Sequence, residues 1–135
     1  MFKRILLPTA VIGVINFLAS MLISQIFSVL SWQVATEYQN PNLFRANSDP
    51  LMLLFFAHPF LLAFVLVWLW QKTKNIFGNN GFKFGFAYWI VATIPGMFAT
   101  YTSMPYSLLM VLSWTISGLV QAIIAGLILS KFDKN

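Results

Sequence analysis

Few side chains in the apolar part of this chain can do chemistry, and His58 is the one that titrates near neutral pH. It precedes Pro59 within a long run without Asp, Glu, Lys or Arg. A histidine at membrane depth is a candidate ligand for a haem or a chlorophyll-like pigment, or a pH-responsive group. The alternative is a structural role beside the Phe55 carbonyl, whose helical hydrogen bond Pro59 removes. Because the chain has one His, we predict no bound cofactor and keep ligation at His58 as the alternative.

Polar side chains recur at every fourth residue in two other apolar runs, which places each set on one face of a helix. The first set is Asn16, Ser20, Ser24 and Ser28, and the second is Ser113, Ser117 and Gln121. At a rise of about 1.5 Å per residue, Asn16 and Gln121 lie at similar depths in two antiparallel helices. We predict a polar seam in which Ser20 faces Ser117 and Ser24 faces Ser113. The alternative is the lining of a polar, water-filled path.

A row of small residues follows the same run as Gln121, again at four-residue spacing: Gly118, Ala122 and Gly126. Small residues let two helix backbones approach closely inside a bilayer. The row lies about 100° around the helix from the polar row, so it faces a different neighbour. We expect close packing within the protein or, alternatively, a contact with a second subunit or another membrane protein.

Catalysis and nucleic-acid binding find little support in the sequence. Glu37 and Asp49 lie in a polar stretch without a metal-ligand pattern, and we expect them to pair with Arg45 in solvent. The sequence Gly78-Asn79-Asn80-Gly81 predicts a turn and lacks the following Lys-Ser/Thr of a phosphate-binding loop. The chain has no Cys, which excludes thiol chemistry and zinc-thiolate sites. The basic residues form no patch with aromatics between them, so we predict no nucleic-acid partner. Because the sequence shows none of these catalytic patterns, we also predict that the protein is not an enzyme.

The elements that must position these residues are long apolar helices. Of the 135 residues, 59% are hydrophobic and 8% charged, against about 25% charged in a soluble domain. Four runs are long enough for a bilayer-spanning helix of about 20 residues: residues 5–32, 51–71, 84–103 and 107–130. We therefore predict an all-α, polytopic membrane protein, a single four-transmembrane-helix bundle in contact with the lipid bilayer.

The basic residues predict the orientation of these spans. Seven of the eight lie before the first span, between the second and third, or after the fourth: Lys3, Arg4, Lys72, Lys74, Lys83, Lys131 and Lys134. Arg45 is on the other side. The positive-inside rule then places both termini and the loop 72–83 in the cytoplasm, and the loop 33–50 outside. Within that outer loop, Ser48-Asp49-Pro50 predicts the start of the second span.

The second half of the chain, from Gln71 onward, resembles a group of small uncharacterised four-helix bacterial membrane proteins. The resemblance rests on Gly81-Phe82-Lys83-Phe84-Gly85, on Tyr101-Thr102, and on a glycine-studded last helix after Trp114. It implies a location in the bacterial cytoplasmic (inner) membrane and implies nothing about chemistry.

Three classes of function follow from the sequence. We favour a non-catalytic accessory or structural subunit that packs against other membrane proteins or against itself. One alternative is a small oligomeric channel or carrier for a neutral solute, using the polar rows. The other is a cofactor-holding or pH-responsive subunit that uses His58.

Overall fold

The computed structural model describes residues 2–46 and 48–133, with side chains from Ile5 onward. The chain is all-α in these residues. Its elements are α1 (Phe2–Leu30), α2 (Trp32–Tyr38), α3 (Met52–Thr73), α4 (Gly81–Tyr88), the π-helical turn η1 (Trp89–Thr93), α5 (Ile94–Ser103) and α6 (Leu108–Phe132). Four helical stretches among the described residues are long and apolar enough to cross a membrane: α1, α3, the continuous α4–η1–α5, and α6.

The first span is shorter than the predicted 5–32, and the predicted outer loop 33–50 contains a helix. The helical path breaks at Ser31, whose backbone is extended (φ −138°, ψ 112°). The Ser31 hydroxyl accepts a hydrogen bond from the Val34 amide at 3.4 Å and so caps α2. Val34 is fully buried, which anchors this short helix to the bundle.

The third span begins at Gly81, three residues before the predicted Phe84. The Asn80 side chain accepts from the Lys83 amide at 3.0 Å and caps the helix start. The predicted turn before it is present, with positive φ at Gly78 and Asn79. The π-helical turn comes just before Pro95. Proline has no backbone N–H to donate, and its ring crowds the carbonyl four residues earlier. A widened turn accommodates both effects.

A short side chain caps the start of α6, whereas α3 begins at Met52 with Leu51 at the N-cap position and no side-chain cap, so the start predicted at Ser48-Asp49-Pro50 lies slightly too early. The Ser107 hydroxyl accepts from the Met110 amide at 3.1 Å and caps α6. Asp49 precedes α3, and its carboxylate accepts from the Leu51 amide at 2.9 Å and from Arg45 at 3.0 Å. The pKa of Asp49 is lowered, most by the hydrogen bond from the Leu51 amide and next by the hydrogen bond from the Arg45 side chain. Of the two acidic residues expected to pair with Arg45, Asp49 forms that ion pair.

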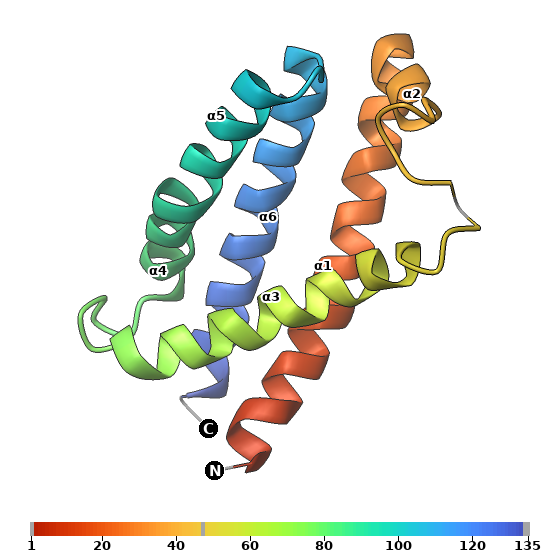
Figure 1. The fold of residues 1–135 in the computed structure, drawn as a ribbon. Helices are drawn as coiled ribbons and strands as arrows, with labels where there is room; N and C mark the ends of the chain where they lie inside the picture. Colours follow the sequence, from red (N-terminus) through yellow and green to blue (C-terminus); the bar gives the residue numbers. More distant parts are fainter. Residues whose placement is uncertain (1, 47, 134–135) are drawn as a thin grey trace.

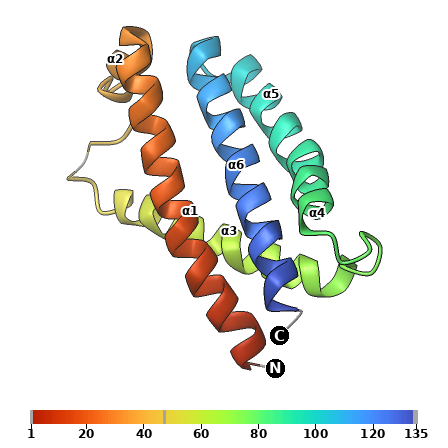
Figure 2. The same cartoon turned by 180° about the vertical axis from the view of Figure 1, so that it is seen from behind.

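The packing centres on α6, which contacts α1, α3 and α4. Figure 1 and Figure 2 show α1, α6 and the α4–α5 stretch running side by side, while α3 lies obliquely across α1 and α6. The main core lies where α3 crosses them, and its buried residues are Ile12, Ala63, Leu66, Val67, Trp70, Phe84, Ala125 and Leu129. All residues of η1 and α5 keep part of their surface exposed.

A polar contact at one end of the bundle ties α3 to the end of α6. Trp70 is fully buried, and its indole N–H donates to the Asp133 carboxylate. Lys74 forms an ion pair with the same carboxylate at 3.0 Å. Both chain ends lie at this end of the molecule (Figure 1). Lys134, and the side chains of Lys3 and Arg4, lie outside the described part of the structure.

Candidate functional site

The predicted seam residues belong to α1 and α6, two helices that pack against each other. Four polar side chains of the described structure are buried: Asn16, Ser113, Ser117 and Gln121, at 0%, 1%, 7% and 7% exposure. Ser20 is half-buried. Buried polar groups of this kind have to find hydrogen-bond partners, because an unpaired one costs about 1–3 kcal/mol.

The hydrogen bonds of these residues run within each helix instead of forming the expected ladder between helices. Ser20 donates to the Phe17 carbonyl at 2.8 Å, and Ser113 donates to the Met110 carbonyl at 2.7 Å. These hydroxyls bond to carbonyls of their own helical turn, a common local alternative for serine in a helix. Among the described residues no hydrogen bond joins Ser20 to Ser117 or Ser24 to Ser113, and the facing of these serines across the two helices stays a prediction.

Two amide side chains are left with unpaired atoms in the seam. Gln121 donates from Nε2 to the Ser117 hydroxyl at 2.9 Å, but its Oε1 has no partner. Asn16 has no partner for Nδ2 or for Oδ1 among the side chains and backbone that the structure describes. The seam thus holds unsatisfied donors and acceptors at full burial.

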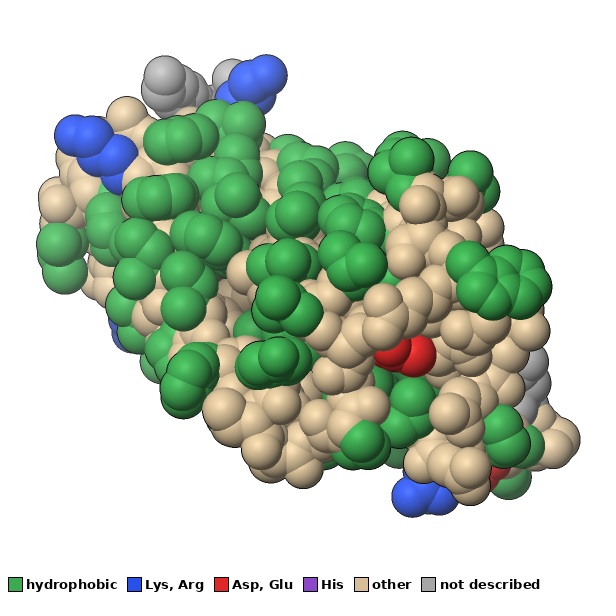
Figure 3. All heavy atoms as spheres, turned by 90° about the horizontal axis from the view of Figure 1, so that it is seen from above, with side chains coloured by type: hydrophobic (Ala, Val, Ile, Leu, Met, Phe, Trp, Pro, Cys, Tyr) green, Lys and Arg blue, Asp and Glu red, His purple; other side chains and the backbone are tan. Residues whose placement is uncertain are grey.

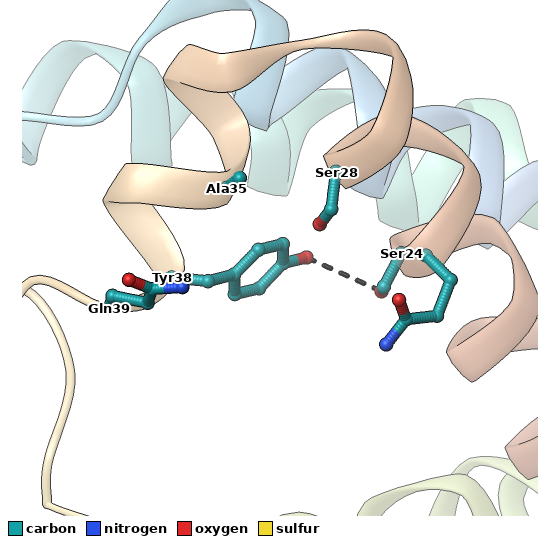
Figure 4. A pocket seen from close by; sticks show the side chains of 6 residues that line it. Ser24, Ser28, Ala35, Tyr38 and Gln39 are labelled. Atoms are coloured by element: carbon teal, nitrogen blue, oxygen red, sulfur yellow. Dashed lines mark hydrogen bonds between the residues drawn. The ribbon is translucent and has the colours of Figure 1, made fainter.

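Beyond the seam, toward α2, the structure forms an open hollow of about 320 Å³ between α1 and α2. It is lined by Ser24, Gln25, Ser28, Ala35, Tyr38 and Gln39. Tyr38 points from α2 toward Ser24 and Ser28 on α1 (Figure 4). Ser24 and Ser28, assigned from sequence to the polar row of α1, are half-buried at this hollow.

Tyr38 joins α1 to α6, a role that the sequence did not reveal. Its hydroxyl donates to Ser24 at 3.3 Å and accepts from the Trp114 indole at 3.0 Å. Phe44 stacks on the Tyr38 ring and contacts Trp114 edge-on, with ring centroids at 5.5 and 6.2 Å. We call Ser24, Tyr38 and Trp114 the Tyr38 bridge. Tyr38 lies on α2, which follows the break at Ser31.

Glu37 fixes the same segment to the start of α6. Its carboxylate accepts from the Ser107 amide at 3.2 Å. A carboxylate at a helix N-terminus is favourable, because the free amides and the helix dipole both attract negative charge. The residue expected to pair with Arg45 in solvent instead holds the loop on the bundle.

The small-residue row of α6 has its neighbour inside the same chain. A Cβ atom added at Gly126 would lie 2.0 Å from the Gly81 carbonyl oxygen, and one added at Gly85 would lie 2.3 Å from the Ala122 carbonyl oxygen. A Cβ atom added at Gly118 would lie 2.8 Å from Cγ2 of Thr93 in η1. Gly118, Ala122 and Gly126 therefore face α4 and η1. This is the close packing within the protein that the four-residue spacing predicts, and the alternative contact of this row with a second subunit stays a prediction.

His58 lies on an exposed side of α3, next to the buried Pro59. Phe55 on the same helix is 65% exposed. Any group bound to the His58 imidazole would therefore lie on the outside of the helical bundle. The described residues of this chain do not enclose a cofactor pocket there.

The four apolar stretches define a multi-pass helical membrane protein. Comparison with protein-family models, with curated proteins and with solved structures finds no match to this chain. The resemblance to small four-helix membrane proteins extends as far as these four helices, and no family is assigned.

Proposed function

We propose that this protein is a non-catalytic subunit of a membrane complex, an accessory or structural component that packs against other membrane proteins or against further copies of itself. The observation that carries the proposal is the apolar surface left outside the bundle. In the most apolar window of the α4–η1–α5 span, 11% of the residues are buried within the chain, against 39% of the residues in the window of α6. A span with so few buried residues leaves part of its surface free for another helix, although α4 packs closely on α6.

Large exposed apolar side chains lie on all four spans, including α3 and α5. Leu53, Leu54 and Phe55 on α3 are 65–70% exposed, and Phe98 on α5 is 71% exposed. Seen from the end that carries α2, hydrophobic side chains cover much of the molecule, with basic side chains at its margins (Figure 3). Lipid covers such side chains without specificity, whereas a partner helix would pack between them.

A crosslinking experiment tests this proposal. The photoreactive analogue benzoylphenylalanine replaces Phe55 or Phe98 in turn, and Phe84, which is 1% exposed, is the matched control. In the membranes of the organism that encodes the protein, we expect a defined protein adduct from the exposed positions and an internal crosslink from Phe84. If both exposed positions give lipid adducts alone, the protein acts without a partner and the proposal is wrong.

We further infer that both termini face the cytoplasm of a bacterium and that the protein lies in its inner membrane. The seven-to-one distribution of basic residues supports this orientation. The turn between α3 and α4 and both chain ends lie at one end of the molecule, opposite α2 (Figure 1). Single cysteines test it cleanly, since the native chain has none.

Cysteines at Asn42 and Asn75 report on the two sides, because both positions are exposed in the turns outside the spans. We expect a membrane-impermeant maleimide on intact cells to label Asn42→Cys and to leave Asn75→Cys unlabelled until the cells are opened. The reverse pattern would show that the orientation is inverted.

A second candidate function is a small channel or carrier for a neutral solute. It is favoured by the buried amides of Asn16 and Gln121, because a packing seam alone has no need of unpaired polar atoms. In proteoliposomes loaded with sucrose, this function predicts faster swelling in glycerol or urea than in protein-free vesicles. Equal swelling rates would exclude it for these solutes.

A further inference from the structure

The unpaired atoms between α1 and α6 have a definite chemical character. Asn16 contributes two N–H donors and one carbonyl oxygen, and Gln121 contributes a second carbonyl oxygen. Ser117 is already engaged by the Gln121 amide nitrogen at 2.9 Å. Donors and acceptors are therefore both present, and none of them carries a charge. Such a set suits a neutral molecule that gives and accepts hydrogen bonds.

The charges around the seam argue against a cation. The chain has three acidic residues, Glu37, Asp49 and Asp133. Glu37 and Asp49 lie outside the spans, and Asp133 lies at the end of α6. The Glu37 carboxylate accepts from the Ser107 amide, Asp49 pairs with Arg45, and Asp133 pairs with Lys74. A cation at the Asn16 amide would thus be buried without a counter-charge nearby, which is costly.

The burial of the site limits the size of the ligand. Asn16 is 0% exposed and Gln121 is 7% exposed, and the open hollow at α2 is lined by residues of the next turns of α1, starting at Ser24. Two members of the Tyr38 bridge, Ser24 and Tyr38, line that hollow, and Ser24 lies about two turns of α1 beyond Asn16. Water is the smallest neutral molecule with both donors and acceptors, and buried water commonly satisfies such groups.

We propose that Asn16, Ser117 and Gln121 form a binding site for water in the middle of the membrane-spanning bundle, between α1 and α6. The Asn16 amide and the Gln121 carbonyl oxygen hold the water. The hollow at α2 begins about two turns of α1 away, at Ser24. The site needs no partner protein, so its test is independent of the proposed role as a subunit.

Solid-state NMR of the full-length, isotope-labelled protein in lipid bilayers tests the proposal. The measurement is the rate at which proton polarisation passes from water to the side-chain amides of Asn16 and Gln121. The internal controls are the backbone amides of Leu66 and Val67, which belong to fully buried residues of the dry apolar core. We expect the two side-chain amides to receive polarisation several-fold faster than these controls.

Variants test whether the polarisation that reaches these side-chain amides comes from water held at this site. Asn16→Leu keeps a similar volume and removes the amide, so transfer to the Gln121 side chain should fall several-fold. Ser20→Ala is the matched control on the same helix, because its hydroxyl bonds to the Phe17 carbonyl, and it should leave the transfer unchanged. If Asn16→Leu does not fold, Gln121→Met tests the same site from α6, and transfer to Asn16 should then fall.

Two results would overturn the proposal. Side-chain amides of Asn16 and Gln121 that are as slow as Leu66 and Val67 would show a dry seam, in which the two amides bond to each other. A chemical shift of the Asn16 or Gln121 carbonyl that moves when sodium replaces potassium would show that the site holds a cation.

Discussion

Alanine at Gly126 is expected to lower the free energy of unfolding by about 3 kcal/mol, the upper part of the usual range for overpacking a tight contact. The added Cβ would lie 2.0 Å from the Gly81 carbonyl oxygen, and neither helix backbone can yield locally. To accept it, α4 and α6 must move apart along the whole contact. Gly81→Ala meets the Gly126 carbonyl oxygen at 1.9 Å and should cost a similar amount.

Gly96 is the matched control for this contact. It lies in α5 with nothing within 4 Å of an added Cβ. Alanine there should leave stability unchanged or raise it by up to about 1 kcal/mol, because alanine favours a helix over glycine. Unfolding titrations of the three variants in detergent micelles, followed by circular dichroism, measure the difference. Equal stability of Gly126→Ala and Gly96→Ala would contradict the close approach of α4 and α6.

Alanine at Trp70 is expected to have the other large effect, a loss of about 3–5 kcal/mol of stability. The ring is fully buried and packs edge-on against Phe84 at a centroid distance of 5.2 Å. Its indole N–H also donates to Asp133, so the truncation both opens a cavity and releases the end of α6. Trp70→Phe keeps one aromatic ring and removes the N–H donor, and it should cost at least about 1.5–3 kcal/mol, the contribution of a hydrogen bond to a charged group.

Trp68 offers a control of the same residue type on the same helix. It is 51% exposed, so its removal creates no cavity inside the bundle. Trp68→Ala should change stability by about 0.5 kcal/mol or less, as surface substitutions do. Near-equal losses for the Trp68 and Trp70 variants would mean that α3 is rotated about its axis relative to the described packing.

Hydropathy alone was enough to predict the four spans, because a long run without charge has few alternatives to a membrane helix. Hydropathy predicted the ends of these spans less accurately than their presence. The predicted first span ran past Ser31, since the Trp32–Tyr38 segment is apolar at its start and its helical turn depends on a single serine cap. The third span was predicted to start three residues too late. Gly81 and Lys83 are typical loop residues, and the sequence alone does not identify the Asn80 side chain as the cap that starts the helix.

The periodicity of the polar and small rows identified which faces of α1 and α6 are special, but not their neighbours. Four-residue spacing gives a direction around one helix axis and says nothing about which helix lies there. Gly81 and Gly85 repeat that spacing on α4 and lie opposite Gly126 and Ala122, a match visible only in space. The Tyr38 bridge was unpredictable for the same reason, since Tyr38 and Trp114 are 76 residues apart.

The mass of the protein in the membrane tests most directly whether it functions within a complex, as we propose. Native mass spectrometry of vesicles prepared from the membranes of the organism that encodes it reports the assembly without detergent extraction. We expect a particle heavier than the 15.3 kDa chain, as a multiple of that mass or as the chain together with a second membrane protein. Detection of the 15.3 kDa chain alone, under conditions that keep other membrane complexes of the same vesicles intact, would contradict it.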